Sequence, residues 1–176
     1  TAEPERPFEN MLFNDAYLTR IDQNGFGNGM TMNEDGHIAH IVENERIIYI
    51  RDDESGEVFT AGYAPVYTPY SSYTCTSGIG YQLIENVTSD LKVTWRVFVP
   101  VGDHPIEIWD LRIENGGDKE RNLSVFTYAE VSLAGVDLYN GALYRFAEYK
   151  KDLNALFILQ DAEQHKVINF PNHNAF

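Results

Sequence analysis

Apolar and polar residues alternate along several stretches of this chain, which is the pattern of β-strands that bury one face. The clearest stretch runs from Leu91 to Val99 and ends before Pro100. Its odd-numbered positions are apolar, and most of its even-numbered positions are polar: Leu91, Val93, Trp95, Val97 and Val99 alternate with Lys92, Thr94 and Arg96. The pattern predicts a strand with one face in a core.

A second pattern of this kind fills the stretch from His104 to Ala134, which predicts two strands. Alternation is clear in both halves of the stretch, but Phe126 and Tyr128 interrupt the polar face of the second half. That face is therefore expected to be half covered, as in a sheet that forms the middle layer of a larger sandwich. Between the halves, residues 115–118 (Asn-Gly-Gly-Asp) tolerate positive φ, so we interpret the stretch as an antiparallel hairpin.

The remaining segments also favour β-structure. Segment 58–73 contains Pro65 and Pro69, and we expect an extended loop or an edge strand there, because proline cannot donate to a central ladder. Segment 11–21 has no clean period and is either an irregular apolar arm or a short helix. Further strands are predicted at 37–42 and 46–51, which would form a hairpin, at 73–77 and 79–86, at 142–149 and 153–160, and at 167–170.

No segment has a convincing helical period, and no internal repeat occurs at a fixed spacing. We therefore predict an all-β protein, and a large antiparallel β-sandwich is favoured over a closed barrel because the turns are irregularly spaced. Residues 1–10 are expected to be an N-terminal arm and residues 11–176 the β-sandwich domain. The first residue is not Met and the last residues show no closing pattern, so we expect a piece of a longer polypeptide whose sandwich is incomplete at its C-terminal end.

Composition and charge narrow the classes of function. A chain of 176 residues with 43% hydrophobic residues can form one domain with a core. Its net charge of −14 would repel nucleic acid and anionic membranes, which leaves a neutral ligand or a protein surface as the favoured partner. Cys75 is the single cysteine and no apolar run approaches the length needed to span a membrane, so we expect a cytoplasmic protein.

Possible metal ligands are weighed against structural roles. His37 and His40 are three residues apart, and on a strand an odd separation places side chains on opposite faces, which argues against a shared ion. The acidic loop 52–57 lacks the alternating order of a calcium-binding loop, so we interpret its carboxylates as solvated. The other histidines are scattered: His104, His165 and His173.

Possible catalytic groups are weighed in the same way. Glu107, Asp110 and Glu114 stand at positions where a strand carries polar residues, and no second acid pairs with them to make a hydrolase site. Cys75 has no flanking cation that would lower its pKa, so we expect a packed thiol. The spaced glycines of residues 23–29 follow no apolar strand and precede no helix, which favours a β-turn over a phosphate-binding loop.

Tyrosines are abundant in the middle and towards the end of the chain. Aromatic rings of this kind either stack on sugar rings or fill the seams and interfaces of a sandwich, and the second role is the commoner one. The residues concerned are Tyr63, Tyr67, Tyr70, Tyr73, Tyr139 and Tyr144.

Five linked motifs carry a family resemblance. Residues 56–66 look like a D-x-G-x-x-W-S-P-x-W-x-P-V stretch, and residues 73–81 are similar to Y-x-C-x-H-G-x-G-Y. Residues 97–100 match V-F-V-P, residues 107–115 match E-I-W-x-L-x-x-x-N, and residues 128–130 match Y-x-E. In this order the motifs resemble the family 94 glycoside phosphorylases, which include cellobiose and chitobiose phosphorylases. The resemblance covers most of the chain, from Phe13 to Phe146. It departs from the family pattern at Phe59, Tyr63 and Ser77, where tryptophan, tryptophan and histidine are common.

The resemblance implies the N-terminal super-sandwich of a multidomain enzyme, with an (α/α)6 catalytic domain downstream and a homodimeric assembly. Such enzymes cleave a β-glucosidic bond of a disaccharide or oligosaccharide with inorganic phosphate as co-substrate, without another cofactor, and invert the anomeric carbon to give an α-sugar 1-phosphate. The general acid of the family is an aspartate in the barrel. We therefore expect no catalytic residue and no metal site in this chain, which should be inactive alone, and neither nucleic acid nor membrane as a partner.

The resemblance also implies where this chain approaches the substrate. A loop after the Y-x-E strand approaches the active site of the neighbouring subunit in the family, and by position this loop is 137–145. Its candidate substrate-binding residues are Asp137, Tyr139, Asn140, Tyr144 and Arg145. An ordinary polar loop is the alternative. For the chain as a whole, a stand-alone carbohydrate-binding module and a purely structural dimerisation domain stay open as other functions.

Overall fold

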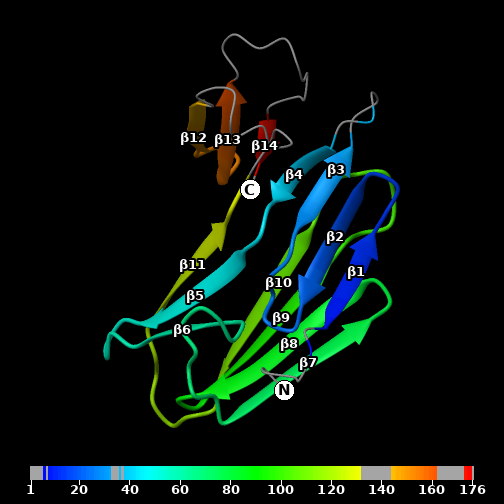
Figure 1. Ribbon diagram of the computed structural model, residues 1–176. Coiled ribbons are helices and arrows are strands. Elements are labelled where there is room, and N and C mark those ends of the chain that lie inside the picture. The colour runs from blue at the N-terminus through cyan, green and yellow to red at the C-terminus, as the bar shows by residue number, and fades with distance from the viewer. Residues whose placement is uncertain are drawn as a thin grey trace.

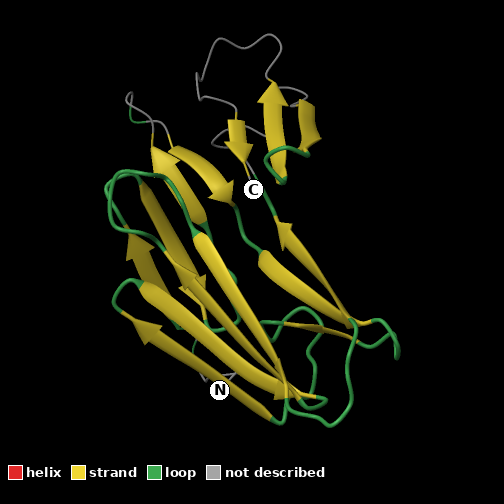
Figure 2. Cartoon of the chain, turned by 180° about the vertical axis from the view of Figure 1, so that it is seen from behind, coloured by secondary structure: helices red, strands yellow, loops and turns green. Residues whose placement is uncertain are grey.

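The computed structural model of the protein describes residues 6, 8–32, 36, 38–131, 144–161 and 173–175. In these residues the chain forms fourteen strands and no helix, as Figure 2 shows, which confirms the predicted all-β class. The first sheet contains, in order, β1 (Glu9–Phe13), β2 (Tyr17–Asp22), β3 (Gly29–Met32) and β4 (Ile38–Val42). The second contains β10 (Ile108–Asn115), β9 (Leu91–Phe98), β8 (Tyr81–Thr88) and β7 (Ser72–Gly78).

Two smaller sheets complete the described part of the chain. The third sheet contains, in order, β11 (Leu123–Ala129), β5 (Arg46–Asp52) and β6 (Val58–Thr60). The fourth contains β12 (Tyr144–Lys150), β13 (Ala155–Asp161) and β14 (His173–Ala175). All pairs of neighbouring strands are antiparallel. The first sheet faces the second, with the third sheet beside them (Figure 1).

The core lies where the first three sheets meet. Alternate residues of β9 are buried, as the sequence predicts, and Trp95 at its centre is 1% exposed. The ring of Trp95 meets the ring of Trp109 edge to face, with 6.0 Å between the ring centroids. The turn that contains Gly25 covers Trp95 so closely that a Cβ at Gly25 would lie 2.3 Å from Cζ3 of Trp95. Gly25 also has φ of +92°, so only glycine fits here, and the segment is the turn that we predicted.

A buried ion pair joins the same three sheets. The Arg46 side chain is fully buried at the start of β5, and its guanidinium donates to Glu107 from Nε at 2.7 Å and from Nη2 at 3.0 Å. Glu107 also accepts hydrogen bonds from Trp109 Nε1 at 2.5 Å and from the Tyr17 hydroxyl at 3.1 Å. The prediction that Glu107 is an ordinary polar strand position is therefore wrong. It precedes β10, and its side chain is only 5% exposed.

The predicted hairpin within residues 104–134 has the right strands but the wrong pairing. β10 pairs with β9, and β11 crosses to the third sheet and pairs with β5. The connection is held on that path because Arg121 donates to Asp52 at the end of β5 and the Asp53 amide donates to the Asn122 carbonyl at 2.9 Å. Contacts distant in the sequence thus decide which sheet β11 joins.

The predicted hairpin of residues 37–42 and 46–51 is also wrong, although both strands form. β4 pairs with β3, whereas β5 pairs with β6 and β11. The residues between β4 and β5 bond to other segments: the Glu43 amide donates to the Glu130 carbonyl, and the Asn44 carbonyl accepts from the Gly27 amide. Because the connection between β4 and β5 is bonded to two other segments, β5 leaves the first sheet and does not form a hairpin with β4.

Segment 11–21 is neither an arm nor a helix, since it forms the hairpin of β1 and β2. Asn14 makes the turn, because its Oδ1 accepts hydrogen bonds from the amides of Ala16 and Tyr17. β1 begins at Glu9, inside the range expected for the arm.

The other strand predictions agree with the structure where it describes them. Strands occupy most of segments 73–77, 79–86 and 153–160, and β6 is a short edge strand followed by loop. The strand predicted at 167–170 lies outside the described residues, and β14 was not predicted.

Candidate functional site

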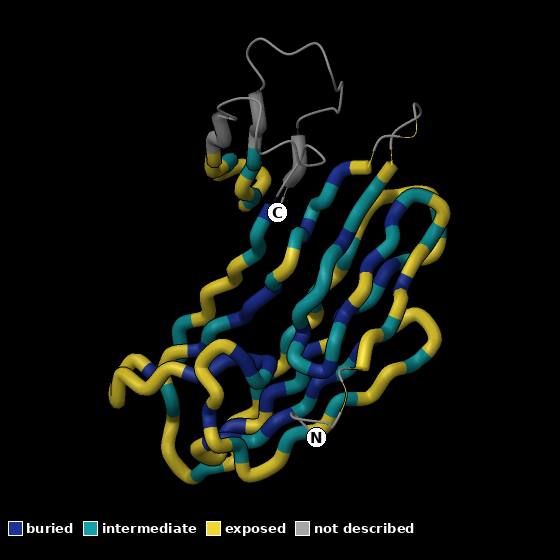
Figure 3. The backbone as a smooth tube through the Cα atoms, viewed as in Figure 1, coloured by how far each residue is buried: buried dark blue, intermediate teal, exposed yellow. Residues whose placement is uncertain are grey.

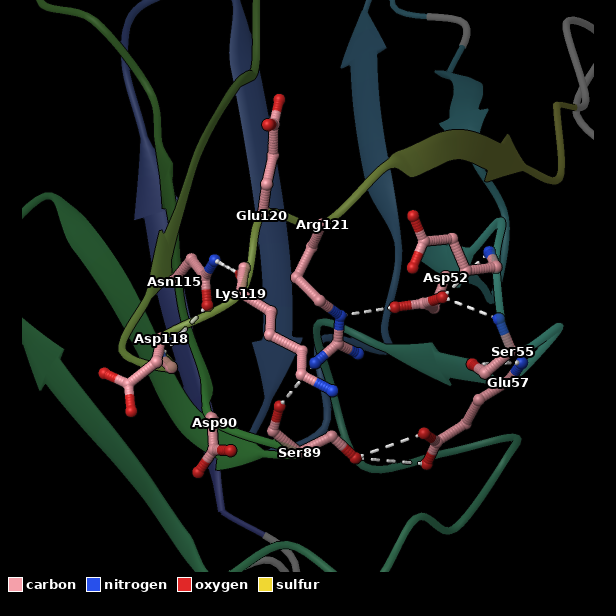
Figure 4. Close-up of a pocket in the computed structure, with 12 residues that line it drawn as sticks. Asp52, Ser55, Glu57, Ser89, Asp90, Asn115, Asp118, Lys119, Glu120 and Arg121 are labelled. Carbon is pink, nitrogen blue, oxygen red and sulfur yellow. Dashed lines mark hydrogen bonds and ion pairs between the residues drawn. The ribbon is translucent and has the colours of Figure 1, made fainter.

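A cavity of about 600 Å³ lies where three chain connections meet (Figure 4). The connections are the turn from β5 to β6, the turn from β8 to β9 and the segment from β10 to β11. Its lining residues are Asp52, Glu54, Ser55, Glu57, Ser89, Asp90, Asn115, Gly117, Asp118, Lys119, Glu120 and Arg121.

Asp52 organises this cavity. Its side chain is 3% exposed, and its Oδ1 accepts hydrogen bonds from the amides of Glu54 at 2.9 Å and Ser55 at 2.8 Å, which closes the turn after β5. Its Oδ2 accepts from Arg121 Nε at 2.5 Å. The Ser55 amide, together with the Arg121 guanidinium, lowers the pKa of Asp52 from 3.8 to about 2. Asp52 is therefore an ionised structural group at neutral pH.

The interpretation of loop 52–57 as solvated is wrong for Asp52 and right for the other carboxylates. Asp53, Glu54 and Glu57 are exposed. Asp53 still has a lowered pKa, because the Ser124 hydroxyl and the Arg51 guanidinium donate to it. Parity explains the difference, since Asp52 continues the buried face of β5 while its neighbours do not.

Arg121 connects all three segments around the cavity. Besides its ion pair with Asp52, it donates from Nη1 to the Ser89 carbonyl at 3.1 Å. The Ser89 hydroxyl in turn donates to Glu57 at 3.1 Å (Figure 4). Ser89 and Asp90 have φ of +47° and +66°, which makes the tight two-residue turn that presents the Ser89 carbonyl to Arg121.

The charges around the cavity limit what it can bind. Six carboxylates and two cationic side chains line it, so the net field repels phosphate and other anions. No histidine or cysteine lines it, and no group of three or more His, Cys, Asp or Glu among the described residues is arranged to hold a metal ion. The cavity offers hydrogen-bonding groups for a neutral polar ligand.

The predicted substrate-binding residues are only in part described. Asp137, Tyr139 and Asn140 lie outside the described residues. Tyr144 and Arg145 lie in β12, opposite Asp161 and Gln160 of β13. Their side chains lie outside what the structure describes, so their role stays a prediction.

The other candidates take structural positions. Cys75 is packed as predicted: the Gln82 amide donates to its Sγ at 2.8 Å, and burial raises the pKa of the thiol to about 11. Asp110 is an exposed strand residue that pairs with Arg96 at 2.8 Å, and Glu114 pairs with Arg112 at 3.4 Å.

The histidines offer no common site. His40 lies in β4 and His173 in β14, while His104 is exposed in the segment before β10. His37 and His165 lie outside the described residues.

Four of the six tyrosines that the sequence analysis considers for sugar stacking lie in one cluster. The rings of Tyr63, Tyr67, Tyr70 and Tyr73 lie with centroids 5.5–6.3 Å apart. The Tyr70 hydroxyl donates to the Thr60 and Gly62 carbonyls, and the Tyr73 hydroxyl donates to the Gln23 carbonyl at 2.9 Å. These two rings fill a seam, whereas Tyr67 is 59% exposed.

Reasoning from the sequence missed Arg46 and Arg121. A signal exists for Arg46, because Arg46 and Asp52 share parity with Ile48 and Ile50, so the buried face of β5 begins and ends with a charge. Each charge needs a partner from elsewhere in the chain, and Glu107 and Arg121 supply them. No signal marks Arg121 within its run of charged residues.

Comparison with known proteins agrees with this all-β architecture. The family described as Glycosyl hydrolase 94, supersandwich domain, matches residues 1–176. The chain belongs to this family. The finding confirms the resemblance drawn from the sequence motifs and the predicted super-sandwich.

Relatives of this supersandwich chain are phosphorylases. It is 29% identical over 165 residues to the solabiose phosphorylase of Paenibacillus borealis, which covers 89% of this chain and 20% of the relative. It is 34% identical over 133 residues to the 3-O-beta-D-glucopyranosyl-beta-D-glucuronide phosphorylase of the same organism, covering 76% of this chain and 17% of the relative. The N,N'-diacetylchitobiose phosphorylase of Vibrio furnissii is 32% identical over 91 residues, which are 51% of this chain and 11% of the relative.

The supersandwich chain thus spans about a fifth of the length of the first two relatives. No helix in the part of the chain that the structure describes is long and apolar enough to span a membrane.

Proposed function

We propose that this supersandwich chain is the N-terminal, non-catalytic part of an inverting disaccharide phosphorylase. The parent enzyme cleaves a β-linked glucoside with inorganic phosphate and releases an α-sugar 1-phosphate. The observation that carries the proposal is the family match over residues 1–176, together with relatives that are phosphorylases of several disaccharides.

A non-catalytic role is supported by the chemistry of the described residues. Asp52 and Glu107 are held by arginines, and the Cys75 thiol is packed with a raised pKa. The cavity beside Arg121 repels phosphate, so the co-substrate binds elsewhere in the parent. We therefore assign the general acid, an aspartate, to a downstream catalytic domain.

The chain serves the parent by forming a homodimer and by shaping its active site. Exposed apolar side chains on β11, among them Phe126 and Tyr128, supply surface for association. Residues 137–145 contact the saccharide, with Asp137, Tyr139, Asn140, Tyr144 and Arg145 as hydrogen-bonding and stacking groups.

Phosphorolysis by the full-length parent tests this proposal. The parent is incubated with phosphate and a panel of β-linked disaccharides, and NMR identifies the released sugar 1-phosphate and its anomer. We expect an α-anomer from the parent and no product from residues 1–176 alone. If no disaccharide is cleaved in a phosphate-dependent way, the phosphorylase function is wrong, and glycan binding by the parent then tests a carbohydrate-binding module.

Variants of the parent test the saccharide contacts separately. Tyr139→Ala and Arg145→Ala are expected to raise KM for the disaccharide, whereas Arg112→Ala, an exposed position on β10, leaves KM unchanged. An unchanged KM in all three variants would make 137–145 an ordinary polar loop.

A further inference from the structure

The outer face of the second sheet is an open surface made by β7, β8, β9 and β10, which lie side by side (Figure 1). The inner face of this sheet is buried around Trp95, so strand parity turns the alternate residues outward. One row of opposite positions on the outer face contains Ile108, Phe98, Tyr81 and Gly78. In the next row Asp110 is opposite Arg96. The register makes these six residues one contiguous surface, which we call the outer platform.

The ring of Tyr81 lies across the neighbouring strand of the outer platform. Gly78 is opposite Tyr81 on β7, and a Cβ at Gly78 would lie 2.2 Å from Cε1 and 2.3 Å from Cζ of the tyrosine ring. The ring therefore occupies the space that a side chain at Gly78 would fill. Tyr81 is still 36% exposed. A ring that rests on a strand in this way is a preorganised apolar surface, which loses little conformational entropy when a ligand binds.

Arg96 supplies hydrogen-bond donors beside this ring. It is diagonal to Tyr81 on the adjacent strand, at a separation that a long side chain can bridge. Its guanidinium lies over the Phe98 ring, with Cζ 4.9 Å from the ring centroid, and its Nη2 donates to Asp110 Oδ2 at 2.8 Å. The Arg96 side chain is 48% exposed. The two contacts hold the guanidinium in place, and its other N–H groups can donate to a ligand.

The charges on the outer face of this sheet balance one another. Three cationic side chains pair there with three carboxylates: Lys92 with Glu85 at 3.5 Å, Arg96 with Asp110 at 2.8 Å and Arg112 with Glu114 at 3.4 Å. The chain as a whole carries a net charge of −14, so this face is an electrically neutral area on an acidic protein. A neutral ligand can bind there without burying an unpaired charge, whereas the field of the chain repels an anion.

We propose that the outer platform binds a neutral, β-linked saccharide chain, apart from catalysis. A pyranose ring has a face of C–H groups, which packs on an aromatic ring, and hydroxyl groups at its edge, which bond to guanidinium and carboxylate groups. Tyr81 offers the first surface, and Arg96 with Asp110 offers the second. Phe98 and Ile108 continue the apolar row, so further sugar rings can lie along it. The class of ligand rests on the proposed function, in which the parent cleaves β-linked glucosides.

Hydroxyl-radical footprinting of the full-length parent tests this saccharide site. The probe is cellopentaose, and phosphate is left out so that no phosphorolysis occurs. Mass spectrometry measures oxidation at Tyr81 and at Tyr67, a tyrosine in another part of the chain that is 59% exposed. Radicals consumed by the sugar lower the oxidation of both residues alike, so the ratio of Tyr81 to Tyr67 oxidation is the quantity compared. We expect this ratio to fall as the probe saturates the site.

Variants of the parent test the two parts of the platform. Gly78→Ala keeps the tyrosine ring but fills the space beneath it, and Arg96→Ala removes the donor. Each is expected to raise the cellopentaose concentration at half protection about tenfold. Arg51→Ala is the matched control, because Arg51 also lies over a phenylalanine ring, that of Phe126, at 5.5 Å and pairs with Asp53, but on the third sheet. It should leave the half-protection concentration unchanged.

Three outcomes overturn the proposal. The saccharide site is wrong if the probe leaves the oxidation ratio unchanged, or if neither variant shifts the half-protection concentration. It is also wrong if Tyr81 is already protected before any sugar is added, because another part of the parent or a second copy then covers the face. The phosphorolysis assay on the same parent separates the two proposals. An active parent without protection of Tyr81 rejects the saccharide site alone, and a protected Tyr81 in a parent that cleaves no disaccharide rejects the phosphorylase function alone.

Discussion

The ion pair of Arg46 and Glu107 is the most demanding arrangement in the core. Both side chains are removed from water, and Arg46 also donates to the Thr19 hydroxyl at 2.5 Å. Burial alone would raise the pKa of Glu107, but the Arg46 guanidinium holds that pKa below its ordinary value. Burial, with Glu107 beside it, raises the pKa of Tyr17. The pair therefore stays charged, and each partner depends on the other.

Removing the charge of Glu107 alone leaves Arg46 buried without a counter-ion. Glu107→Gln is expected to lower the free energy of unfolding by about 3–5 kcal/mol, the usual cost of breaking a buried pair. Glu114→Gln, which breaks an exposed pair on β10, is the control and should cost about 0–1 kcal/mol. Urea denaturation of the two variants measures the difference.

The double variant Arg46→Met/Glu107→Leu completes the test. It removes both charges, so it should recover much of the stability lost in Glu107→Gln. A cost for Glu107→Gln as small as that of the control would contradict a dry ion pair.

Single residues also show where reasoning from the sequence ends. Trp95 was placed in the core by its parity alone, because one strand contains all the information needed. Arg46 needs Glu107, which is 61 residues away, and no local pattern links them. The burial of Asn86 and Gln82 cannot be predicted locally either. Their hydrogen-bond partners, Ala61 and Cys75, belong to other elements.

At the scale of elements, the sequence predicts strands better than it predicts their partners. The alternation that marks β10 and β11 reports only that each has one face to bury. Pairing of β11 with β5 depends on Arg121 and Asp52, which are 69 residues apart. The candidate cavity could not be predicted at all, because it exists only where three connections converge.

β11 combines an apolar composition with incomplete cover. Its Val125, Phe126 and Tyr128 are 45%, 50% and 46% exposed. By strand parity Val125 lies on one face of the third sheet and Phe126 and Tyr128 lie on the other. No residue of β11 is buried, as the colouring of its backbone in Figure 3 shows. Among the described strands it hydrogen-bonds only with β5, so no described strand pairs with its other edge. Such an edge pairs readily with a second molecule.

Residues 1–176 in isolation are therefore expected to associate through β11 as their concentration rises. Phe126→Lys/Tyr128→Lys places charge on this edge strand and should shift the molecules to monomers. Leu153→Lys adds one charge at an exposed apolar turn position and should leave association unchanged. Sedimentation velocity over a range of concentrations measures the association of the unsubstituted fragment and of both variants. If the unsubstituted fragment 1–176 is monomeric at every concentration, the expectation is wrong.

For the whole molecule, acidic residues have two opposite effects on the stability of the fold. The net charge of −14 at neutral pH favours solubility but adds repulsion that opposes the compact state. The carboxylates of Asp52, Asp53 and Glu107 work the other way, because each has a lowered pKa in the folded protein. When a carboxylate has a lower pKa in the folded protein than in the unfolded chain, the unfolded chain binds protons at a higher pH than the folded protein does. These three groups therefore stabilise the fold above about pH 4, and this stabilisation is lost as the pH falls through their folded pKa values.

Asp52 allows this contribution to be isolated, since its pKa falls from 3.8 to about 2. Asp52→Asn should be less stable than the wild type at neutral pH, because the ion pair with Arg121 is lost. The difference should be constant above about pH 4 and narrow as the pH falls through about 2, where protonated aspartic acid resembles asparagine. Asp118→Asn removes the same charge from the same cavity while leaving every contact of Asp52 in place, so it corrects for the change in net charge. Urea unfolding at a series of pH values measures the free energy of unfolding of both variants and of the wild type. If the difference in this free energy between the wild type and Asp52→Asn stays constant down to pH 2, Asp52 is not held ionised by Ser55 and Arg121.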